Sequence, residues 1–312
     1  MELVRGLQNI SHAPRGCVLT VGNYDGVHLG HQEMIRAVKR RAAELGVPAT
    51  VLVFEPSSKE FIDPEGAPPR LTRWREKFAA LEAAGVDRLV TLRFNERMRG
   101  MSPEAFVDEL IVSGLGARHV VVGDDFRYGS QACGTIDSLQ AAGRAQGFGV
   151  EQMAPFVIDG VRVSSTAVRE RLEQADYAGA ARLLGRRYRI TGHVAHGRQL
   201  GRTLGFPTAN LHLMRHKSPT WGVSAVQVYG IERQPLPGVA SLGTRPTVNG
   251  TEPLLEVHVF DFAGDLYGRL IEVEFIAKLR DEVKFDSLGP MIEQMKVDAA
   301  QAREILAKVD SG

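Results

Sequence analysis

The sequence predicts an N-terminal α/β domain with a doubly wound parallel sheet, followed by a small antiparallel β-barrel and a C-terminal helix. With 312 residues, the chain exceeds the usual size of one hydrophobic core, which favours two domains. In the first half, continuous apolar runs alternate with helical patterns, as is typical of a parallel sheet covered on both faces. In the second half, short β-type segments separated by Gly and Pro are typical of an antiparallel barrel or sandwich.

The first half contains four continuous apolar runs that we expect to be strands, at residues 17–22, 49–54, 88–94 and 119–123. Helix starts are readable between them. Thr72 precedes one helical pattern, and Ser102 followed by Pro103 supplies an N-cap and a proline at the first helical position. Ligands of such an open sheet bind beyond the carboxyl ends of its strands.

The second half contains five expected strands, at residues 188–194, 222–229, 238–242, 255–262 and 270–275. A closing helix over residues 287–308 repeats apolar side chains with a period near that of an α-helix. Between the halves, a short helix starting at Tyr177 ends at Gly185. We therefore expect one domain over residues 1–182 and a second over residues 183–312.

Composition favours small-molecule substrates. Lys and Arg total 38 and Asp and Glu total 37, so the chain has no overall positive charge that would attract nucleic acid or an anionic membrane. The sequence gives no expectation for the oligomeric state. Cys17 and Cys133 are far apart and outside any metal-ligand spacing, which argues against a disulfide framework or a zinc site. No run approaches about 18 apolar residues, and we expect a cytoplasmic protein.

The most informative segment is residues 22–31, called here the Gly22 turn. An apolar strand breaks into Gly22 and Gly26 and then enters a helix, which places free N–H groups and a positive helix end where phosphate can bind. His28 and His31 are three residues apart and can reach one anion from the same side of the first helical turn. A plain strand-to-helix connection, or half of a metal site, is the alternative.

Two further clusters contain polar groups suited to phosphate and to metal. Residues 163–169 present three hydroxyls at a helix start and an arginine one turn later, which suits a polyphosphate; taken alone, they favour an ordinary N-cap with a solvated arginine. In residues 201–211, Thr208 and Asn210 offer neutral oxygens two residues apart on one face of a strand, which suits Mg²⁺. A structural Gly-Pro turn is the alternative there.

These clusters, taken with their neighbours, resemble two enzyme families in sequence order. Residues 22–31, 122–129 and 164–169 resemble the FMN adenylyltransferases of the nucleotidyltransferase superfamily. The remaining matches resemble riboflavin kinases and lie at residues 201–211, 237–248, 255–258, 265–268, 279–280 and 284–285. Because both resemblances together cover nearly all of the chain, it looks like a bacterial bifunctional riboflavin kinase/FAD synthetase.

The resemblance implies that riboflavin is phosphorylated by ATP to FMN, and that FMN is adenylylated by a second ATP to FAD, releasing pyrophosphate. It implies that His28 and His31 neutralise the transferring phosphates, and that Glu256 takes the proton of the ribityl 5′-hydroxyl. Mg²⁺ would bridge ATP to Thr208 and Asn210. The implied nucleotide-binding residues are Gly22, Asn23, Asp25, Ser165, Thr166, Arg169, Gly201, Arg202 and Gly205, with Ser165, Thr166 and Arg169 on the leaving pyrophosphate. The implied flavin-binding residues are Asp124, Asp125, Phe126, Asn210 and Arg280.

The chain departs from the family pattern at several positions, which are Tyr24, Ser57, Ser58, Ala132, Thr135, Ser224 and Ser241. The changes at Ser58, Ala132 and Thr135 motivate a second hypothesis, a riboflavin kinase whose N-terminal half transfers AMP poorly. A third hypothesis is a regulatory protein that binds flavin or nucleotide without catalysis.

Overall fold

The computed structural model describes residues 1–10, 16–195, 206–213, 215, 217–247 and 250–309. The chain forms two compact units, one of residues 1–68 with 73–164, the other of residues 69–72 with the chain from Ser165 onward. The predicted architecture, a parallel α/β sheet followed by an antiparallel barrel and a C-terminal helix, is confirmed.

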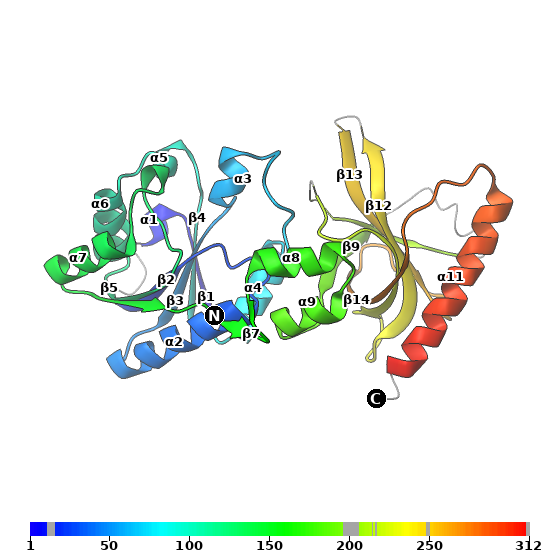
Figure 1. Ribbon diagram of the computed structural model, residues 1–312, viewed down its shortest axis with the longest axis horizontal. Helices are drawn as coiled ribbons and strands as arrows, with labels where there is room; N and C mark the ends of the chain where they lie inside the picture. The colour runs from blue at the N-terminus through cyan, green and yellow to red at the C-terminus, as the bar shows by residue number, and fades with distance from the viewer. Residues whose placement is uncertain (11–15, 196–205, 214, 216, 248–249, 310–312) are drawn as a thin grey trace. The chain divides into compact units, whose positions relative to one another are not determined.

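The first unit is built on a six-stranded sheet in the order β1-β4-β3-β2-β5-β6, with every pair parallel (Figure 1). The strands are β1 (Glu2–Arg5), β2 (Cys17–Val21), β3 (Ala49–Phe54), β4 (Arg88–Leu92), β5 (Ala117–Gly123) and β6 (Gly149–Met153). The four central strands are those expected from their apolar runs. The two edge strands were not predicted, because β1 and β6 are only partly buried and have no continuous apolar run.

Helices and a small hairpin complete this unit. They are α1 (Leu7–Ile10), α2 (Leu29–Leu45), α3 (Ser58–Ile62), α4 (Trp74–Ala83), α5 (Glu96–Arg99), α6 (Pro103–Ala105), the π-helix η1 (Phe106–Gly114), the 3₁₀ turn η2 (Ser130–Ala132), α7 (Ile136–Gln146), and the β7 (Val157–Ile158) to β8 (Val161–Arg162) hairpin. The N-cap predicted at Ser102 is confirmed, since its Oγ accepts from the Ala105 N–H at 3.1 Å. The start predicted after Thr72 is off by one residue, because the Arg73 N–H donates to Glu76 Oε2 and Arg73 becomes the N-cap of α4.

The order of the strands places a switch point between β2 and β5. From β2 the chain moves outward through β3 and β4 on one side, and β5 and β6 then lie on the other side. In open parallel sheets, ligands bind beyond the carboxyl ends of the strands at such a point. The Gly22 turn follows β2 and residues 124–126 follow β5, so the topology brings these two predicted segments to the same end of the sheet.

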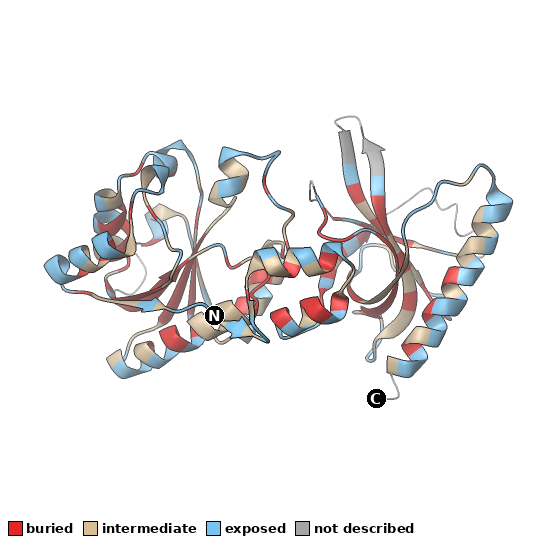
Figure 2. Ribbon diagram, in the orientation of Figure 1, coloured by how far each residue is buried: buried red, intermediate tan, exposed pale blue. Residues whose placement is uncertain are grey.

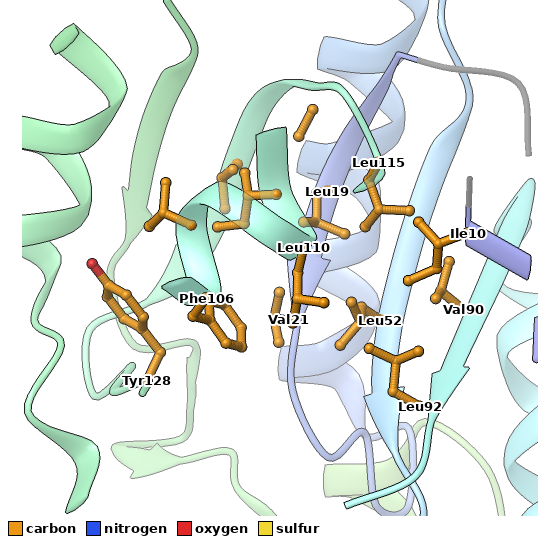
Figure 3. Packing of buried hydrophobic residues seen from close by; sticks show 14 of the residues in the cluster. Ile10, Leu19, Val21, Leu52, Val90, Leu92, Phe106, Leu110, Leu115 and Tyr128 are labelled. Carbon is orange, nitrogen blue, oxygen red and sulfur yellow. The ribbon is translucent and has the colours of Figure 1, made fainter. Parts of the chain in front are cut away.

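One large apolar cluster of the first unit lies between the sheet and η1, and two further clusters include residues of α2 and α4. Figure 3 shows Phe106 and Leu110 of η1 facing Leu19 and Leu52 of the central strands. Leu19, Leu52 and Leu110 are completely buried. Figure 2 shows the central strands as buried and the outer turns of α7 as exposed, so the sheet is covered as its apolar sequence requires.

The second unit is a closed antiparallel barrel in the order β10-β13-β12-β11-β14-β9 (Figure 1). Its strands are β9 (Arg189–Ala195), β10 (Ala209–His212), β11 (Gly222–Tyr229), β12 (Leu236–Thr247), β13 (Gly250–Val259) and β14 (Leu270–Arg280). The helices are α8 (Ser165–Glu173), α9 (Tyr177–Leu184) and α11 (Leu288–Val309). The predicted end of the short helix at Gly185 is confirmed, since this residue is a left-handed C-cap with φ of 73°.

Helix α11 packs on the outside of the barrel. Its Ala302 and Leu306 share an apolar cluster with Ala225 of β11. An ion pair fixes the same helix near its middle, because Arg280 of β14 donates from Nε and Nη2 to the buried carboxylate of Asp298 at 2.7–3.1 Å. Apolar packing and one buried charge pair therefore hold α11 against the strands.

Replacing Leu110 by Ala should lower the free energy of unfolding of the first unit by about 2–5 kcal/mol, because a cavity is left at a site with no exposure. The chain has two tryptophans, and Trp74 lies in the first unit while Trp221 lies in the second. Urea unfolding followed by Trp74 fluorescence in a Trp221→Phe background measures this unit alone. The exposed Ser113→Ala change on the same helix should shift it by less than about 0.5 kcal/mol. An equal loss in both variants would contradict the assignment of the core.

Candidate functional site

The Gly22 turn is held in a strained backbone conformation. Its Gly22 N–H donates to Leu52 O at 3.1 Å, which fixes the exit from β2 against β3. Gly26 has φ of 85°, and the non-glycine residues Tyr24 and Val27 have φ of 49° and 42°. Such angles cost about 1–3 kcal/mol each for residues with a side chain, and they cluster at functional sites. The strain indicates that the turn is shaped for a ligand.

Buried contacts stabilise this strained turn. Tyr24 and Val27 are 2% and 1% exposed and belong to an apolar cluster that includes Leu81 of α4. The Tyr24 hydroxyl lies 2.7 Å from Thr20 Oγ1 in a hydrogen bond. The tyrosine that departs from the family pattern therefore keeps the packing of a phenylalanine and gives its hydroxyl a partner.

His28 and His31 come together as the sequence predicted. Their rings stack at 3.6 Å between centroids with an interplanar angle of 16°. His28 is the N-cap of α2, and its Nδ1 accepts from the His31 N–H at 3.3 Å. The ring of Tyr24 lies 4.7 Å from that of His31 on another side. The two imidazoles are thus fixed at the helix N-terminus, where the positive end of the helix dipole favours an anion.

The His31 imidazole is held in its neutral form. Burial lowers its pKa well below the usual value of 6.5, and the neighbouring His28 and Lys77 lower it further. Its Nδ1 is buried without a hydrogen-bond partner. At neutral pH, His31 can therefore offer hydrogen bonds to a phosphate but no positive charge.

Other residues predicted on the nucleotide side are distributed over both units. Asn23 is exposed and Asp25 is half-buried in the turn. A Cβ at Gly30 would lie 3.1 Å from Val163 O, closer than an ordinary contact, so the segment between β8 and Ser164 lies against the turn. Residues 165, 166 and 169 begin the second unit, where Arg169 Nε donates to Pro69 O at 2.6 Å.

The segment after β5 carries the predicted flavin-side residues. Arg162 of β8 forms a two-pronged ion pair with Asp124, at 2.7 and 3.0 Å, and lies 3.6 Å from Asp125. The Phe126 ring is nearly parallel to that of Tyr128, with centroids 5.6 Å apart. This segment therefore presents paired carboxylates and an aromatic ring at the same end of the sheet as the Gly22 turn.

An aromatic cluster at that end was missed by the sequence reasoning. Phe94 lies edge-on to Phe54 at 5.7 Å and to Phe61 at 5.5 Å. Phe54 is the last residue of β3, Phe61 lies in α3 and Phe94 follows β4, and all three rings are only partly buried. The sequence did contain a signal for this cluster, because the expected strands at residues 49–54 and 88–94 both end in a phenylalanine.

The departures from the family pattern in this unit have local structural roles. Ser57 caps α3 in a reciprocal arrangement with Glu60, and Thr135 caps α7 in the same way with Ser138. Ser58 is the first residue of α3. Ala132 has φ of 57° in the turn before α7. These positions therefore keep an ordered loop structure with different side chains.

In the barrel, strand pairing brings the predicted metal ligand and base together. Asn210 of β10 is directly opposite Glu256 of β13, and Glu256 is directly opposite Ser241 of β12. Directly opposed residues project from the same face of a sheet, with Cβ atoms about 4.5–5.5 Å apart. One face therefore carries the polar side chains of Asn210, Glu256 and Ser241, and Thr208 lies just before β10, two residues from Asn210.

His258 is a second residue that the sequence reasoning missed. It lies two residues after Glu256 on the same strand, and its Nδ1–H donates to Pro207 O at 2.9 Å. Its ring also lies edge-on to Phe206 at 5.2 Å. The histidine thus ties the segment before Thr208 to the strand that bears Glu256.

The remaining predicted residues of the barrel are either engaged or outside the described part. Arg280 is bound to Asp298, and Ser241 Oγ donates to Glu282 Oε1 at 2.9 Å. Ser224 Oγ is hydrogen bonded to the Tyr177 hydroxyl at 3.0 Å. The predicted nucleotide-binding residues Gly201, Arg202 and Gly205 lie outside the described residues. Within the described ranges, no group of three or more His, Cys, Asp or Glu side chains is placed to hold a metal ion.

Comparison with known proteins gives full-length matches. The family model of FAD synthetase matches residues 10–167, and that of riboflavin kinase matches residues 184–306. A Pseudomonas fluorescens protein named bifunctional riboflavin kinase/FMN adenylyltransferase is 50% identical over 98% of both chains, and an Escherichia coli K12 protein of the same name is 46% identical over 97% of both.

A crystal structure also matches. It is that of a Streptococcus pneumoniae protein described as a macrolide-efflux protein, with a TM-score of 0.80 at 30% identity over 96% of this chain and 97% of that one. In the part of this chain that the structure describes, none of the helices combines the length and the apolarity needed to cross a membrane.

The lowered pKa of His31 predicts a pH dependence of stability. Below about pH 6.5 the unfolded chain binds a proton at His31 while the folded chain does not, so the free energy of unfolding falls as the pH falls, by at most about 1.4 kcal/mol per pH unit from this group. The free energy of unfolding is measured between pH 7 and pH 5 by Trp74 fluorescence in the Trp221→Phe background. Its slope against pH should be smaller in a His31→Gln variant. Identical slopes would show that His31 titrates normally.

Proposed function

Since the chain belongs to the family of bifunctional riboflavin kinase/FMN adenylyltransferases, we propose that its two activities lie in separate domains, adenylyl transfer in residues 1–182 and riboflavin phosphorylation in residues 183–312. The enzyme phosphorylates riboflavin with ATP to FMN and adenylylates FMN with ATP to FAD. The two family models support the division, because one ends at residue 167 and the other starts at residue 184.

The stacked His28 and His31 pair is the observation that supports an adenylyl-transfer site at the Gly22 turn. There, an oxygen of the FMN phosphate attacks the α-phosphorus of ATP, and the bond to the β-phosphate oxygen breaks as pyrophosphate leaves. No covalent enzyme intermediate is needed, so catalysis consists of alignment and charge stabilisation. The two imidazoles orient the transferring phosphate, with Gly22, Asn23 and Asp25 beside it.

Two further sets of residues are assigned to the other substrate groups. Ser165, Thr166 and Arg169 hold the leaving pyrophosphate through hydroxyls at a helix start and a guanidinium. Asp124, Asp125 and Phe126 line the flavin side. The edge-on rings of Phe54, Phe61 and Phe94, at the same end of the sheet, offer apolar surface for a flat ring system.

Riboflavin phosphorylation is assigned to the polar face of the barrel. Glu256 takes the proton from the ribityl 5′-hydroxyl as that oxygen attacks the γ-phosphorus of ATP, and the bond from the γ-phosphorus to the bridging oxygen breaks as ADP leaves. Asn210 lies directly opposite Glu256, so a ligand held by its side chain would adjoin the base. Asn210 and Arg280 are assigned to the flavin. The ion pair with Asp298 holds Arg280 in place at the end of β14.

Thr208 and Asn210 suit Mg²⁺ because both offer neutral oxygen donors on one face, and this cation takes few protein ligands and keeps several waters. When bound, Mg²⁺ neutralises charge on the ATP phosphates. The interaction of His258 with Pro207 O supports this assignment, since it holds the segment before Thr208 in place. Gly201, Arg202 and Gly205 are assigned to the nucleotide.

A cytoplasmic location is proposed from the thiols. Cys17 is buried and Cys133 is exposed, and both are free. Burial raises the pKa of the Cys17 thiol to about 11, so it stays protonated and unreactive. An exposed unpaired thiol suits a reducing compartment.

The separation of the two sites predicts opposite effects of two variants. His31→Ala should abolish FAD formation from FMN and spare FMN formation from riboflavin, while Glu256→Ala should do the reverse. Chromatography of flavins after incubation with riboflavin or FMN, ATP and Mg²⁺ distinguishes these outcomes. Wild-type protein that stops at FMN would favour the hypothesis of a weakened adenylyltransferase half, and unchanged riboflavin would favour a regulatory protein.

The proposed metal ligand predicts a change in the requirement for Mg²⁺. Asn210→Ala should raise the Mg²⁺ concentration that gives half-maximal FMN formation by about 10-fold or more, because one oxygen ligand is lost. His212→Ala, at an exposed position of the same strand, serves as the matched control and should leave it unchanged. FAD formation from FMN by both variants should be normal. An unaltered Mg²⁺ dependence in Asn210→Ala would exclude it as a ligand.

A further inference from the structure

The adenylyl-transfer site needs positive charge, which His31 is poorly suited to provide. Both substrates bring phosphates, and the bond that breaks leaves additional negative charge on pyrophosphate. His31 is neutral at physiological pH, because burial and two positive neighbours disfavour its protonated form. A group that stays charged when buried would meet this requirement, and one lies on α4.

Lys77 occupies an unusual position for a lysine. Trp74, Lys77 and Leu81 lie at positions i, i+3 and i+7 of α4, and therefore on one face of the helix. Leu81 is completely buried and Lys77 is only 4% exposed. Lysine is almost never this deeply buried unless it is paired, because its charge loses the solvation of water. An apolar residue would pack on this face without that cost.

The buried face of α4 packs against the Gly22 turn. Leu81, with Trp74 and Phe78 beside it, belongs to the same apolar cluster as Tyr24 and Val27 of the turn. Lys77 lies between Trp74 and Leu81 on that face, so its side chain enters the core of the unit beside the turn. Its charge is felt there, as the effect on His31 shows.

A second contact places the ammonium at the carboxyl end of the sheet. Lys77 Nζ lies 3.9 Å from Glu55 Oε2. Glu55 is the first residue after β3, and β3 is paired with β2, whose end leads into the turn. The cation is thus on the ligand-binding side of the sheet, next to the strand that carries Gly22.

We propose that Lys77 supplies a fixed positive charge to the adenylyl-transfer site, in addition to the guanidinium assigned to Arg169, and stabilises the phosphates of FMN and ATP as they react. The inference rests on the proposed function of the Gly22 turn. As the bond from the FMN phosphate oxygen to the α-phosphorus forms and the bond to the β-phosphate oxygen breaks, negative charge moves onto the leaving pyrophosphate. A cation already fixed in a site of low dielectric constant stabilises that charge without reorganising.

Lys77→Met tests the inference, since methionine keeps much of the length and the apolar packing while removing the charge. The expected result is a fall of about 10²-fold in kcat for FAD formation from FMN and ATP, with FMN formation from riboflavin unchanged. The pKa of His31, followed by NMR titration, should rise, because a neighbouring positive charge has been removed. Lys77→Arg retains the charge and should keep more activity than Lys77→Met.

Arg88→Met is the matched control. Arg88 is a buried cation of the same unit, 3% exposed and paired with Glu2 at 2.6 Å, but it starts β4 at the opposite end of the sheet. It should lower stability and leave kcat for FAD formation within about 3-fold, since its charge is remote from the phosphates.

Three results would overturn the inference: normal kcat in Lys77→Met, equal losses in Lys77→Met and Arg88→Met, or equal losses in Lys77→Met and Lys77→Arg. A Lys77→Met protein that does not fold is replaced by Lys77→Arg, whose complete inactivity in a folded protein would also overturn it. Failure of the wild-type protein to form FAD would instead refute the proposed adenylyl-transfer function.

Discussion

The parallel pairing of β2 with β5 is the interaction on which the proposed adenylyl-transfer site depends. Because the strand order reverses between them, the loops that follow these two strands emerge at the same end of the sheet. The Gly22 turn follows one strand, and Asp124 to Phe126 follow the other. Buried apolar strands thus determine which polar residues meet, and the strained angles at Tyr24 and Val27 persist because the core beneath them is well packed.

Burial also gives the residues around the turn different electrostatic roles. An imidazole taken out of water loses its proton readily, whereas the intrinsic pKa of a lysine is high enough for it to stay charged beside a carboxylate. His31 is therefore suited to directional hydrogen bonding, and Lys77 to supplying charge. A motif gives the identity of a side chain but not its protonation state. The family resemblance therefore does not separate a residue that donates hydrogen bonds from one that supplies charge.

In the barrel, strand register brings distant polar residues together. Asn210 and Glu256 are 46 positions apart in the numbering, and antiparallel pairing of β10 with β13 makes them direct neighbours on one face. A shift of one residue would turn one of them to the opposite face. His258 and the ion pair of Arg280 with Asp298 then hold the adjoining segments, so the polar face rests on a rigid frame.

The sequence by itself determined the two architectures, most of the strands and the histidine pair, because apolar periodicity, helix caps and glycine turns are local signals. It did not reveal β1 and β6, whose mixed burial leaves no continuous apolar run. Only the tertiary structure decided that His31 is neutral, that Lys77 lies beside the turn, that His258 contacts Pro207, and that Asp298 binds Arg280. Each of these depends on burial or on contact between distant segments, which packing creates and local sequence does not encode.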